Sequence, residues 1–366
     1  MRVSVIGSTE GVHMNDATTV AIDLAKDVFE LAFGNGAGQI VERKRLSRRA
    51  FARCLENRPR LEVVMEACGS AHYWARRLQA QGHGVRLLPA RDVRPYVRRN
   101  KTDRADAAGL LEAARCCQID PVPVKSPRQQ GLQALHRARE LLKGQRTAGL
   151  NLVRGLLREY GIAIPAGAAK VPAAVRDALE DGENDLPMCL RATVAEQMER
   201  IQALAAGMAA IERRLEEEAR ADVAVQRYQT VPGVGLLTAT ALRAGAGDLA
   251  RFRSGRHLAA WLGVVPREHS SGQQRRLGKI TKRGDSYLRT LLIHGGRAVL
   301  RSAVMRQRAG RPIDSLQAWA LELQQRQGHN KAAVALANKL ARRLWAIDHH
   351  GAAFNPAHIS VKPQAA

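Results

Sequence analysis

The sequence predicts an N-terminal α/β domain, then a long helical arm, then a mainly helical and basic C-terminal domain. Three observations predict this order. Short β-branched and apolar runs alternate with turn residues over residues 18–88. A heptad repeat of apolar residues lies near the middle of the chain, and the last third is helical in pattern, basic and punctuated by Gly. A chain of 366 residues has room for two or three domains, since single cores usually stop growing at about 250–300 residues.

The first domain is predicted over residues 14–125, as a β-meander followed by a strand–helix–strand unit. Its strands are expected at 18–23, 28–33, 39–44, 61–65 and 85–88, and its helices at 49–57, 72–81 and 105–117. This order indicates a mixed sheet with helices packed on it. The first dozen residues show no clear pattern, so Met1 and Met14 both stay open as the natural start.

The helical arm is predicted over residues 126–225, with long helices at 129–160 and 190–221. A Gly/Pro/Ala-rich break is expected between them, at 165–187. In the second helix, apolar residues recur every seven positions with a companion stripe: Val194, Ile201, Met208 and Leu215, with Leu204 and Ile211. This is a coiled-coil pattern, which fits an antiparallel hairpin or a dimerisation arm, and equally an ordinary helix of a bundle.

The third domain is predicted over residues 226–350, with a loose tail at 351–366. V-P-G-V-G, ending in Gly233, Val234 and Gly235, precedes a helical run and resembles a helix-hairpin-helix turn. In such a turn, Gly233 and Gly235 let a phosphate approach backbone N–H groups, a contact that carries no sequence information. The alternative is a simple helix-terminating turn. Residues 329–345 read as a basic amphipathic helix, with one face available to a nucleic-acid backbone.

A strongly basic segment follows the V-P-G-V-G turn. Residues 251–301 contain twelve Lys or Arg and two acidic residues. Cations flank a Ser-Ser-Gly loop and are expected to hold a phosphate: Arg267, Arg275, Arg276, Lys279, Lys282 and Arg283. From the residues alone, Ser270 and Ser271 are either phosphate-binding hydroxyls or a nucleophile, since a serine attacks only when it is assisted.

Composition points to a polyanionic partner. The formal net charge is +24 and the isoelectric point is about 10.9, which favours nucleic acid. The five cysteines show neither C-x-x-C nor zinc spacing, so reduced thiols and a cytoplasmic location are expected. Action on DNA would make the protein nucleoid-associated while it works. No run of about 20 apolar residues predicts a membrane span.

Four carboxylates predict a Mg²⁺ site. Asp23 and Glu66 each end a predicted strand, whereas Asp103 and Asp106 open a helix at i, i+3 and therefore share a face. Mg²⁺ prefers oxygen ligands, and two such ions can activate a nucleophile and stabilise the leaving oxygen of a phosphodiester. Taken singly, Asp103 also fits a helix N-cap and Glu66 a surface charge.

Three segments resemble the DEDD family of insertion-sequence transposases, relatives of the Piv invertase: A-I-D-L-A-K-D-V-F, M-E-A-C-G-S and R-N-K-T-D-R-A-D-A. The resemblance covers roughly residues 18–348, and the K-T-D-x-x-D block is its most specific part. It implies a RuvC-like N-terminal domain of the ribonuclease H-like α/β fold. It also implies that the four acidic positions that bind Mg²⁺ are Asp23, Glu66, Asp103 and Asp106.

The same resemblance implies a serine nucleophile in the C-terminal transposase domain. The family's serine stands just before a Gly and five residues after a Pro, so Pro266 and Gly272 select Ser271, with Ser270 one alignment step away. In the family this serine attacks DNA and forms a phosphoserine link. The implied partners are donor and target DNA, a bridge RNA that pairs with both, and one or three further copies of the chain, in a homodimer or homotetramer with a composite active site.

Two alternatives stay open. One is a Mg²⁺-dependent RuvC-like junction resolvase or nuclease that uses water in place of serine. The other is a non-catalytic nucleic-acid-binding protein with a degenerate first domain.

Overall fold

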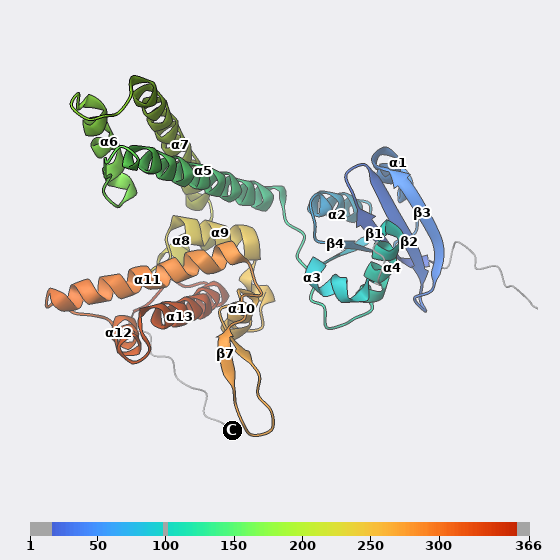
Figure 1. Cartoon of the computed structure of the whole chain (residues 1–366). Helices are drawn as coiled ribbons and strands as arrows, with labels where there is room; N and C mark the ends of the chain where they lie inside the picture. The colour runs from blue at the N-terminus through green and yellow to red at the C-terminus, as the bar shows by residue number, and fades with distance from the viewer. Residues whose placement is uncertain (1–16, 98–101, 357–366) are drawn as a thin grey trace, which may run out of the picture. The chain divides into compact units, whose positions relative to one another are not determined.

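The structure is a computed structural model that describes residues 17–97 and 102–356 (Figure 1). The predicted domain start at residue 14, Lys101 of the K-T-D-x-x-D block and the end of the tail lie outside the described residues. The chain divides into two compact units, Met1–Ser126 and Pro127–Ala366. Across the described parts of the chain, no helix combines the length and apolarity needed to cross a bilayer.

The first unit is built on a five-stranded mixed sheet with the strand order β3-β2-β1-β4-β5. β1, β2 and β3 pair antiparallel, whereas β4 and β5 continue from β1 in parallel. The strands are β1 (Ala17–Leu24), β2 (Val28–Asn35), β3 (Ile40–Ser47), β4 (Glu62–Glu66) and β5 (Gly84–Leu88). The predicted α/β domain with a mixed sheet is confirmed.

Helices cover both faces of this sheet: α1 (Arg48–Cys54), α2 (Ala71–Ala80), α3 (Ala90–Val93), η2 (Arg94–Tyr96) and α4 (Asp103–Ala114). On one face, Ile22 packs in a cluster with Phe51 of α1 and Trp74 of α2, whose rings meet edge to face at 4.8 Å. On the other face, Ala21 packs with Leu110 of α4. Successive strand side chains point to opposite faces, so Asp23, two residues after Ala21, lies on the α4 face.

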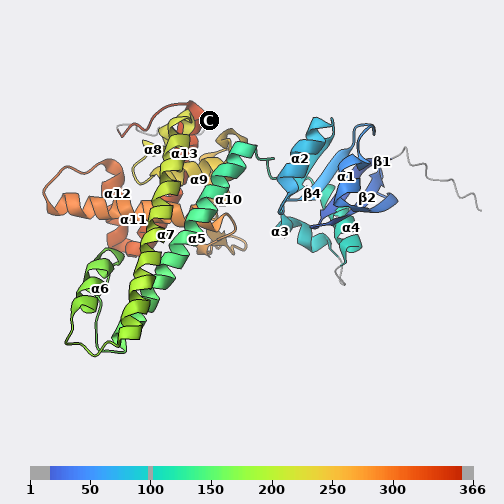
Figure 2. The ribbon, with the colours of Figure 1, turned by 90° about the horizontal axis from the view of Figure 1, so that it is seen from above.

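The arm of the second unit is an antiparallel helical hairpin within one chain. Its long helices, α5 (Pro127–Arg158) and α7 (Met188–Arg220), lie side by side in both views (Figures 1 and 2). Arg139 of α5 pairs with Glu212 of α7 at 2.6 Å, and Gly149 faces Ile201. Of the predicted heptad stripe, Val194, Ile201, Ile211 and Leu215 are buried. The stripe is therefore used inside the chain.

One expectation for the arm is wrong in part. The segment 165–187, predicted as a break, contains the helix α6 (Val171–Glu180). Val171, Val175 and Ala178 of α6 are buried. Val171 and Val175 pack into the core between α5 and α7. This tertiary packing stabilises α6, although the Gly- and Pro-rich flanks do not favour a helix.

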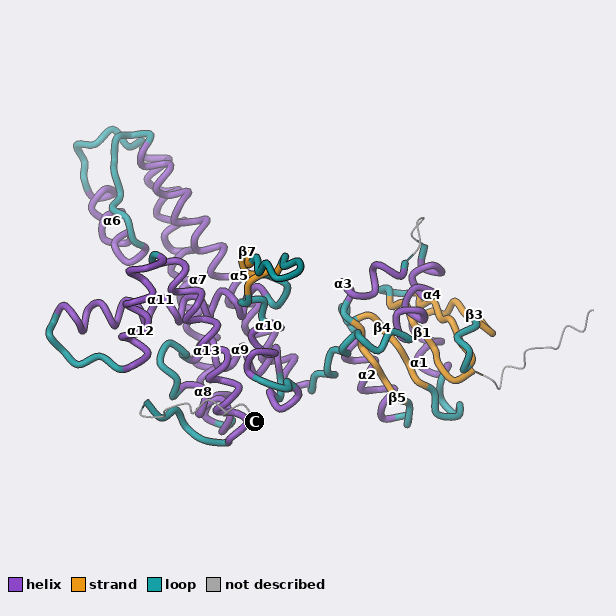
Figure 3. The backbone as a smooth tube through the Cα atoms, turned by 90° about the horizontal axis from the view of Figure 1, so that it is seen from below, coloured by secondary structure: helices purple, strands orange, loops and turns teal. Residues whose placement is uncertain are grey.

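The rest of the second unit is mainly helical, with one short ribbon of two strands (Figure 3). Its elements are α8 (Val223–Gln229), α9 (Leu236–Ala246), η4 (Leu249–Arg251), α10 (Gly255–Trp261), β6 (Pro266–Glu268), β7 (Leu277–Ile280), α11 (Ser286–Arg308), α12 (Ser315–Gln327) and α13 (His329–His350); η3 (Ala168–Lys170) precedes α6 in the arm. The predicted mainly α character is confirmed. The β6–β7 ribbon was not predicted.

α13 is amphipathic, as expected, and one of its faces is built into the core. Its apolar stripe, which includes Leu336, Leu340 and Leu344, is fully buried. Cations on its other side also contact the protein, because the Lys339 ammonium lies 4.1 Å from the Trp319 ring centroid. Burial lowers the pKa of Lys339, and neighbouring arginines lower it further. α13 is therefore a core helix of this unit.

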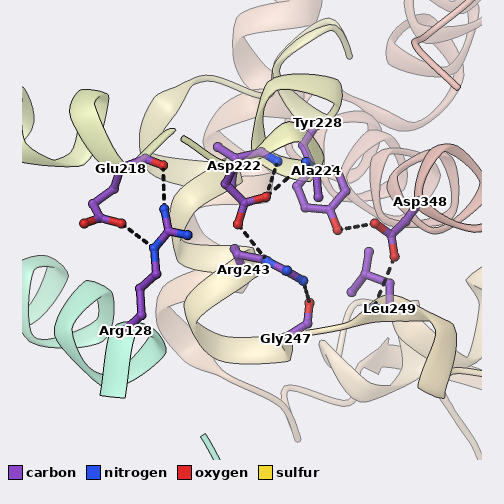
Figure 4. A network of polar contacts seen from close by, with 10 residues as sticks. Arg128, Glu218, Asp222, Ala224, Tyr228, Arg243, Gly247, Leu249 and Asp348 are labelled. Carbon is purple, nitrogen blue, oxygen red and sulfur yellow. Dashed lines mark hydrogen bonds and ion pairs between the residues drawn. The ribbon is translucent and has the colours of Figure 1, made fainter. Parts of the chain in front are cut away.

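A polar network ties the arm to this helical core (Figure 4). Arg243 of α9 donates to the carboxylate of Asp222, at the end of the arm, with an Nε–Oδ2 distance of 2.9 Å. The Tyr228 hydroxyl donates to Asp348 of α13 at 2.6 Å, and the other Asp348 oxygen accepts the Leu249 N–H. These bonds fix the entry of α8 and α9 into the core, since buried polar groups are stable only when they are paired.

Candidate functional site

The two strand-end carboxylates lie next to each other. β1 and β4 are parallel with Ile22 opposite Met65, so the following residues, Asp23 and Glu66, occupy neighbouring positions. Val64 packs on the α4 face, and Glu66, two residues later, lies on that same face. Both carboxylates are half-buried. The sheet thus presents two acids side by side at the end of two parallel strands.

α4 directs its acidic N-terminal end toward the same edge. Leu111, near the end of α4, packs over Gly34, which pairs with Thr19 near the start of β1. The helix therefore runs opposite to β1, and its start lies toward the end of β1, where Asp23 stands. Asp106 is half-buried and Asp103 is exposed.

The helix start also settles one alternative. The N-cap of α4 is Thr102, whose hydroxyl oxygen accepts the Ala105 N–H at 3.2 Å. Asp103 is the first residue inside the helix, so the interpretation of Asp103 as the N-cap is wrong. Asp106 precedes the buried Leu110 by one helical turn and therefore lies on the stripe that faces the sheet. Carboxylates in a first turn are also favoured by the helix dipole.

Electrostatics link the two strand-end acids. Burial raises the pKa of the Cys68 thiol, and the carboxylates of Glu66 and Asp23 raise it further. Both charges are therefore felt at one place, just after β4. A cation at this edge would relieve the crowding of negative charge.

The donor set fits Mg²⁺ in its chemistry, since it consists of carboxylate oxygens only. It is not closed into one cluster: within residues 17–97 and 102–356, no three His, Cys, Asp or Glu side chains lie close enough together to hold a metal ion. The structure brings Asp23 and Glu66 together and directs Asp103 and Asp106 toward the same edge.

Ser271 stands at the tip of the β6–β7 ribbon. Its N–H donates to the Gln274 carbonyl at 3.3 Å, and the Gln274 N–H donates back at 3.1 Å, which closes a two-residue turn. Gly272 begins this turn with a φ of 55°, as tight hairpin turns require. The Ser271 side chain is exposed, and its hydroxyl makes no hydrogen bond to any residue that the structure describes.

Ser270 is held inside the ribbon. Its hydroxyl donates to Glu268 Oε1 at 2.7 Å and accepts the Arg276 N–H at 3.1 Å. The Ser270 hydroxyl is therefore engaged by the ribbon itself, whereas the Ser271 hydroxyl is open to a ligand at the tip.

The predicted phosphate-binding cations lie on this ribbon and directly after it. Each is exposed: Arg267, Arg275, Arg276, Lys279, Lys282 and Arg283. Arg275 lies 3.7 Å from Glu268, but both side chains are more than half exposed, so this ion pair is weak and easily exchanged for a phosphate. We call residues 266–283 the basic ribbon.

The V-P-G-V-G turn joins α8 to α9 as expected, but its two glycines differ. At Gly233 the φ is 85°, and a Cβ atom would lie 2.7 Å from the Gly295 carbonyl oxygen of α11. Gly233 is therefore required by packing, a role that the sequence did not reveal because Gly295 is distant in the chain. Gly235 is exposed at the start of α9, and a Cβ there would meet no described atom within 4 Å. Only Gly235 keeps the open approach predicted for phosphate contact.

Comparisons with known proteins identify the family of the chain. A family model described as Transposase IS116/IS110/IS902 family matches residues 225–309, which include Ser271, and a DEDD model of the IS110 type described as Transposase matches residues 20–162, which include the four acids. A probable family 20 transposase of Pseudomonas aeruginosa is 44% identical, covering 92% of this chain and 98% of that protein. The transposases for insertion sequence elements IS1111A of Coxiella burnetii and IS1328 of Yersinia enterocolitica are 37% and 34% identical, covering 91% and 93% of this chain and 90% and 100% of those proteins. The chain belongs to the IS110 family of DEDD transposases.

Proposed function

We propose that this transposase cuts and rejoins DNA through a covalent phosphoserine intermediate at Ser271. One observation carries the proposal: of the two adjacent serines, only Ser271 has a hydroxyl that is exposed and not engaged by the ribbon itself. It stands among cations that suit a phosphodiester, in a protein of the right family.

In the proposed step, Ser271 Oγ attacks the phosphorus of a DNA phosphodiester. The Oγ–P bond forms, the P–O bond to one deoxyribose breaks, and the leaving oxygen takes up a proton while the serine proton passes to solvent or a nearby base. Attack by a DNA hydroxyl on the phosphoserine reverses these changes and rejoins the strand. Arg275 and Arg276 directly follow the turn closed by Ser271 and Gln274, where their charges neutralise the non-bridging oxygens.

The acidic edge of the first unit is proposed as the cation site, held by Asp23, Glu66, Asp103 and Asp106. When bound there, Mg²⁺ supplies polarisation of the phosphate and stabilisation of the leaving oxygen. The neighbouring positions of the two strand-end acids and the direction of α4 support this assignment. The RuvC-like fold of residues 14–125 is part of the same proposal, as are the boundaries at 126, 226 and 351.

We further propose that the partners are donor and target DNA together with a bridge RNA that pairs with both. The net charge of +24 suits binding of both DNA and RNA. The guide RNA is inferred from the resemblance to the family. The protein is proposed to act in the cytoplasm, at the nucleoid, as a homodimer or homotetramer. In this assembly the acidic edge of one copy and the Ser271 of another act on the same phosphate.

Trapping of the covalent adduct tests the serine. The full chain, with RNA transcribed from the flanking DNA, is incubated with element-end DNA that carries a nick to prevent religation. Wild-type protein and Ser270→Ala should form a denaturant-resistant protein–DNA adduct, whereas Ser271→Ala should form none and recombine at background. An adduct with Ser271→Ala would overturn the assignment.

Two other outcomes identify the alternatives. Mg²⁺-dependent cleavage without any adduct favours a nuclease that uses water. Nucleic-acid binding without cleavage of duplex, junction or guided substrates favours a non-catalytic binding protein. The guide is tested separately, by sequencing RNA that copurifies from cells carrying the flanking DNA; absence of a discrete RNA from beside the gene would remove it.

A further inference from the structure

A cavity of about 450 Å³ lies in the second unit where α5, α9 and the start of α11 meet. Its size is typical of small-ligand sites, which usually span about 300–1,000 Å³. His136 of α5 and Tyr287 of α11 form one wall, and Ala241 and Ala244 of α9 contribute small apolar surfaces. Neither the acidic edge nor Ser271 lies among its lining residues.

The aromatic wall is preformed by hydrogen bonds. The Thr240 hydroxyl donates to the Leu236 carbonyl at 2.7 Å, so it accepts from His136 Nε2–H at 3.0 Å. His136 Nδ1 then carries the lone pair and accepts from the Tyr287 hydroxyl at 2.9 Å. Burial lowers the pKa of His136 to about 4, so the ring is neutral at physiological pH. Both rings are therefore fixed before any ligand enters.

The rim carries donors and acceptors together. Gln133 and Arg137 offer N–H groups. The Glu140 carboxylate is paired with Arg139 and Lys143. Asp285 accepts two α11 N–H groups through Oδ1 and keeps Oδ2 as an acceptor at the rim. Arg137 is exposed and has no acidic partner within the described residues. A neutral, flat heterocycle with donors and acceptors on its edge matches both the apolar interior and the polar rim.

The position of the cavity indicates where such a heterocycle would come from. Asp285 and Tyr287 directly follow Lys282 and Arg283, the last cations of the basic ribbon. A nucleic acid whose backbone lies on the ribbon therefore passes close to the rim. A base reaches a pocket of this kind only after it leaves the stack, as in enzymes that flip bases.

We propose that this cavity receives one unstacked nucleobase of the nucleic acid that binds the basic ribbon. The inference rests on the nucleic-acid binding of the proposed function, but it does not depend on covalent attack by Ser271.

Photocrosslinking tests the proposal. Full-length Ser271→Ala protein is mixed with element-end oligonucleotides that each carry one 5-iodopyrimidine at successive positions, and crosslinked peptides are mapped by mass spectrometry. At one position the crosslink should map to Tyr287 or His136. Ala244→Leu fills the cavity, and it should abolish this crosslink and weaken binding of that oligonucleotide about tenfold. Ala138→Leu, on the exposed side of α5, is the matched control and should retain both.

If Ala244→Leu does not fold, Arg137→Ala is used, because it alters only the exposed rim; about fivefold weaker binding is expected. Crosslinks confined to the ribbon at every position would overturn the proposal, as would wild-type affinity in the folded cavity variants. The two proposals fail separately. Loss of the Ser271 adduct with an intact cavity crosslink removes only the phosphoserine mechanism, and the reverse result removes only the base pocket.

Discussion

The acidic edge of the first unit and the basic ribbon of the second are built in opposite ways. Asp23 and Glu66 are fixed by strand pairing and Asp106 by a capped helix, and all three are half-buried. Ser271 stands on strands of three and four residues whose side chains are almost all exposed. A two-stranded hairpin alone is only marginally stable in water. The difference teaches that the fold itself positions the carboxylates of the acidic edge, whereas little packing positions the serine at the tip of the basic ribbon.

The largest expected effect comes from changing the carboxylates of the acidic edge. Asp23→Asn and Asp106→Asn should each lower recombination by about 10³-fold, because an amide is a weak ligand for a hard cation and removes one negative charge. Recombination of a marked element in cells measures this loss. Asp27→Asn, in the exposed turn after β1, is the control, and thermal unfolding should show all three variants folded. Near-normal recombination by Asp106→Asn would exclude Asp106 from the site.

Substitutions of the two glycines in the V-P-G-V-G turn test how tightly this turn packs on α11. Gly233→Ala should destabilise this unit by about 3 kcal/mol, because its φ is positive and the new Cβ would press against the α11 backbone. Gly235→Ala, where the space is open, should change the free energy of unfolding by less than about 1 kcal/mol. Urea denaturation compares the pair. Equal stabilities would show that the turn does not pack closely on α11.

The dependence of stability on pH can be compared between the two units, because each contains a histidine that is neutral in the folded state. Burial lowers the pKa of His136, and separately that of His72, to about 4 in each case. The unfolded chain binds these protons more strongly, so stability is complete above about pH 6.5 and is lost as pH falls toward 4. At pH 5 the buried, neutral His136 should lower the free energy of unfolding by about 2 kcal/mol relative to pH 7.

The half-buried His72 should lower the free energy of unfolding at pH 5 by less than His136 does. Urea unfolding at pH 7 and pH 5 measures the difference, with His136→Gln and His72→Gln expected to lose part of the pH dependence. A larger effect of His72→Gln than of His136→Gln would reverse the assignment.

The smallest expected effect concerns the arm. Arg128 and Glu218 form an ion pair at 2.7 Å, but their side chains are 51% and 39% exposed. A double-mutant cycle should give a coupling below about 1 kcal/mol, falling with salt. The Arg139–Glu212 pair, in which Arg139 is only 12% exposed, is the internal comparison and should couple more strongly. Equal couplings would show that burial along the arm does not matter.

Much of the first unit could be predicted from the sequence, because its β-branched runs end in carboxylates at turns. The second unit was harder to predict for three physical reasons. α6 is stabilised by packing against the arm rather than by its own composition. β6 and β7 are short and polar, so they show no alternation. Gly233 is explained by a carbonyl 62 positions away, at Gly295. Ser270 and Ser271 differ because only the Ser270 hydroxyl is hydrogen-bonded within the ribbon, and residue spacing does not reveal such bonds.

The exposed ribbon has a consequence for how the second unit tolerates a broken chain. Residues on both sides of the tip build one core, with Leu258 and Leu262 packed beside Leu292 and Leu340. Exposed tips are the preferred points of proteolysis, and Arg275 and Arg276 are substrates for trypsin. A single cut there leaves two fragments that stay associated through the shared core. Protection of this bond by bound nucleic acid then reports when the ribbon is covered, with no need for strand transfer to occur.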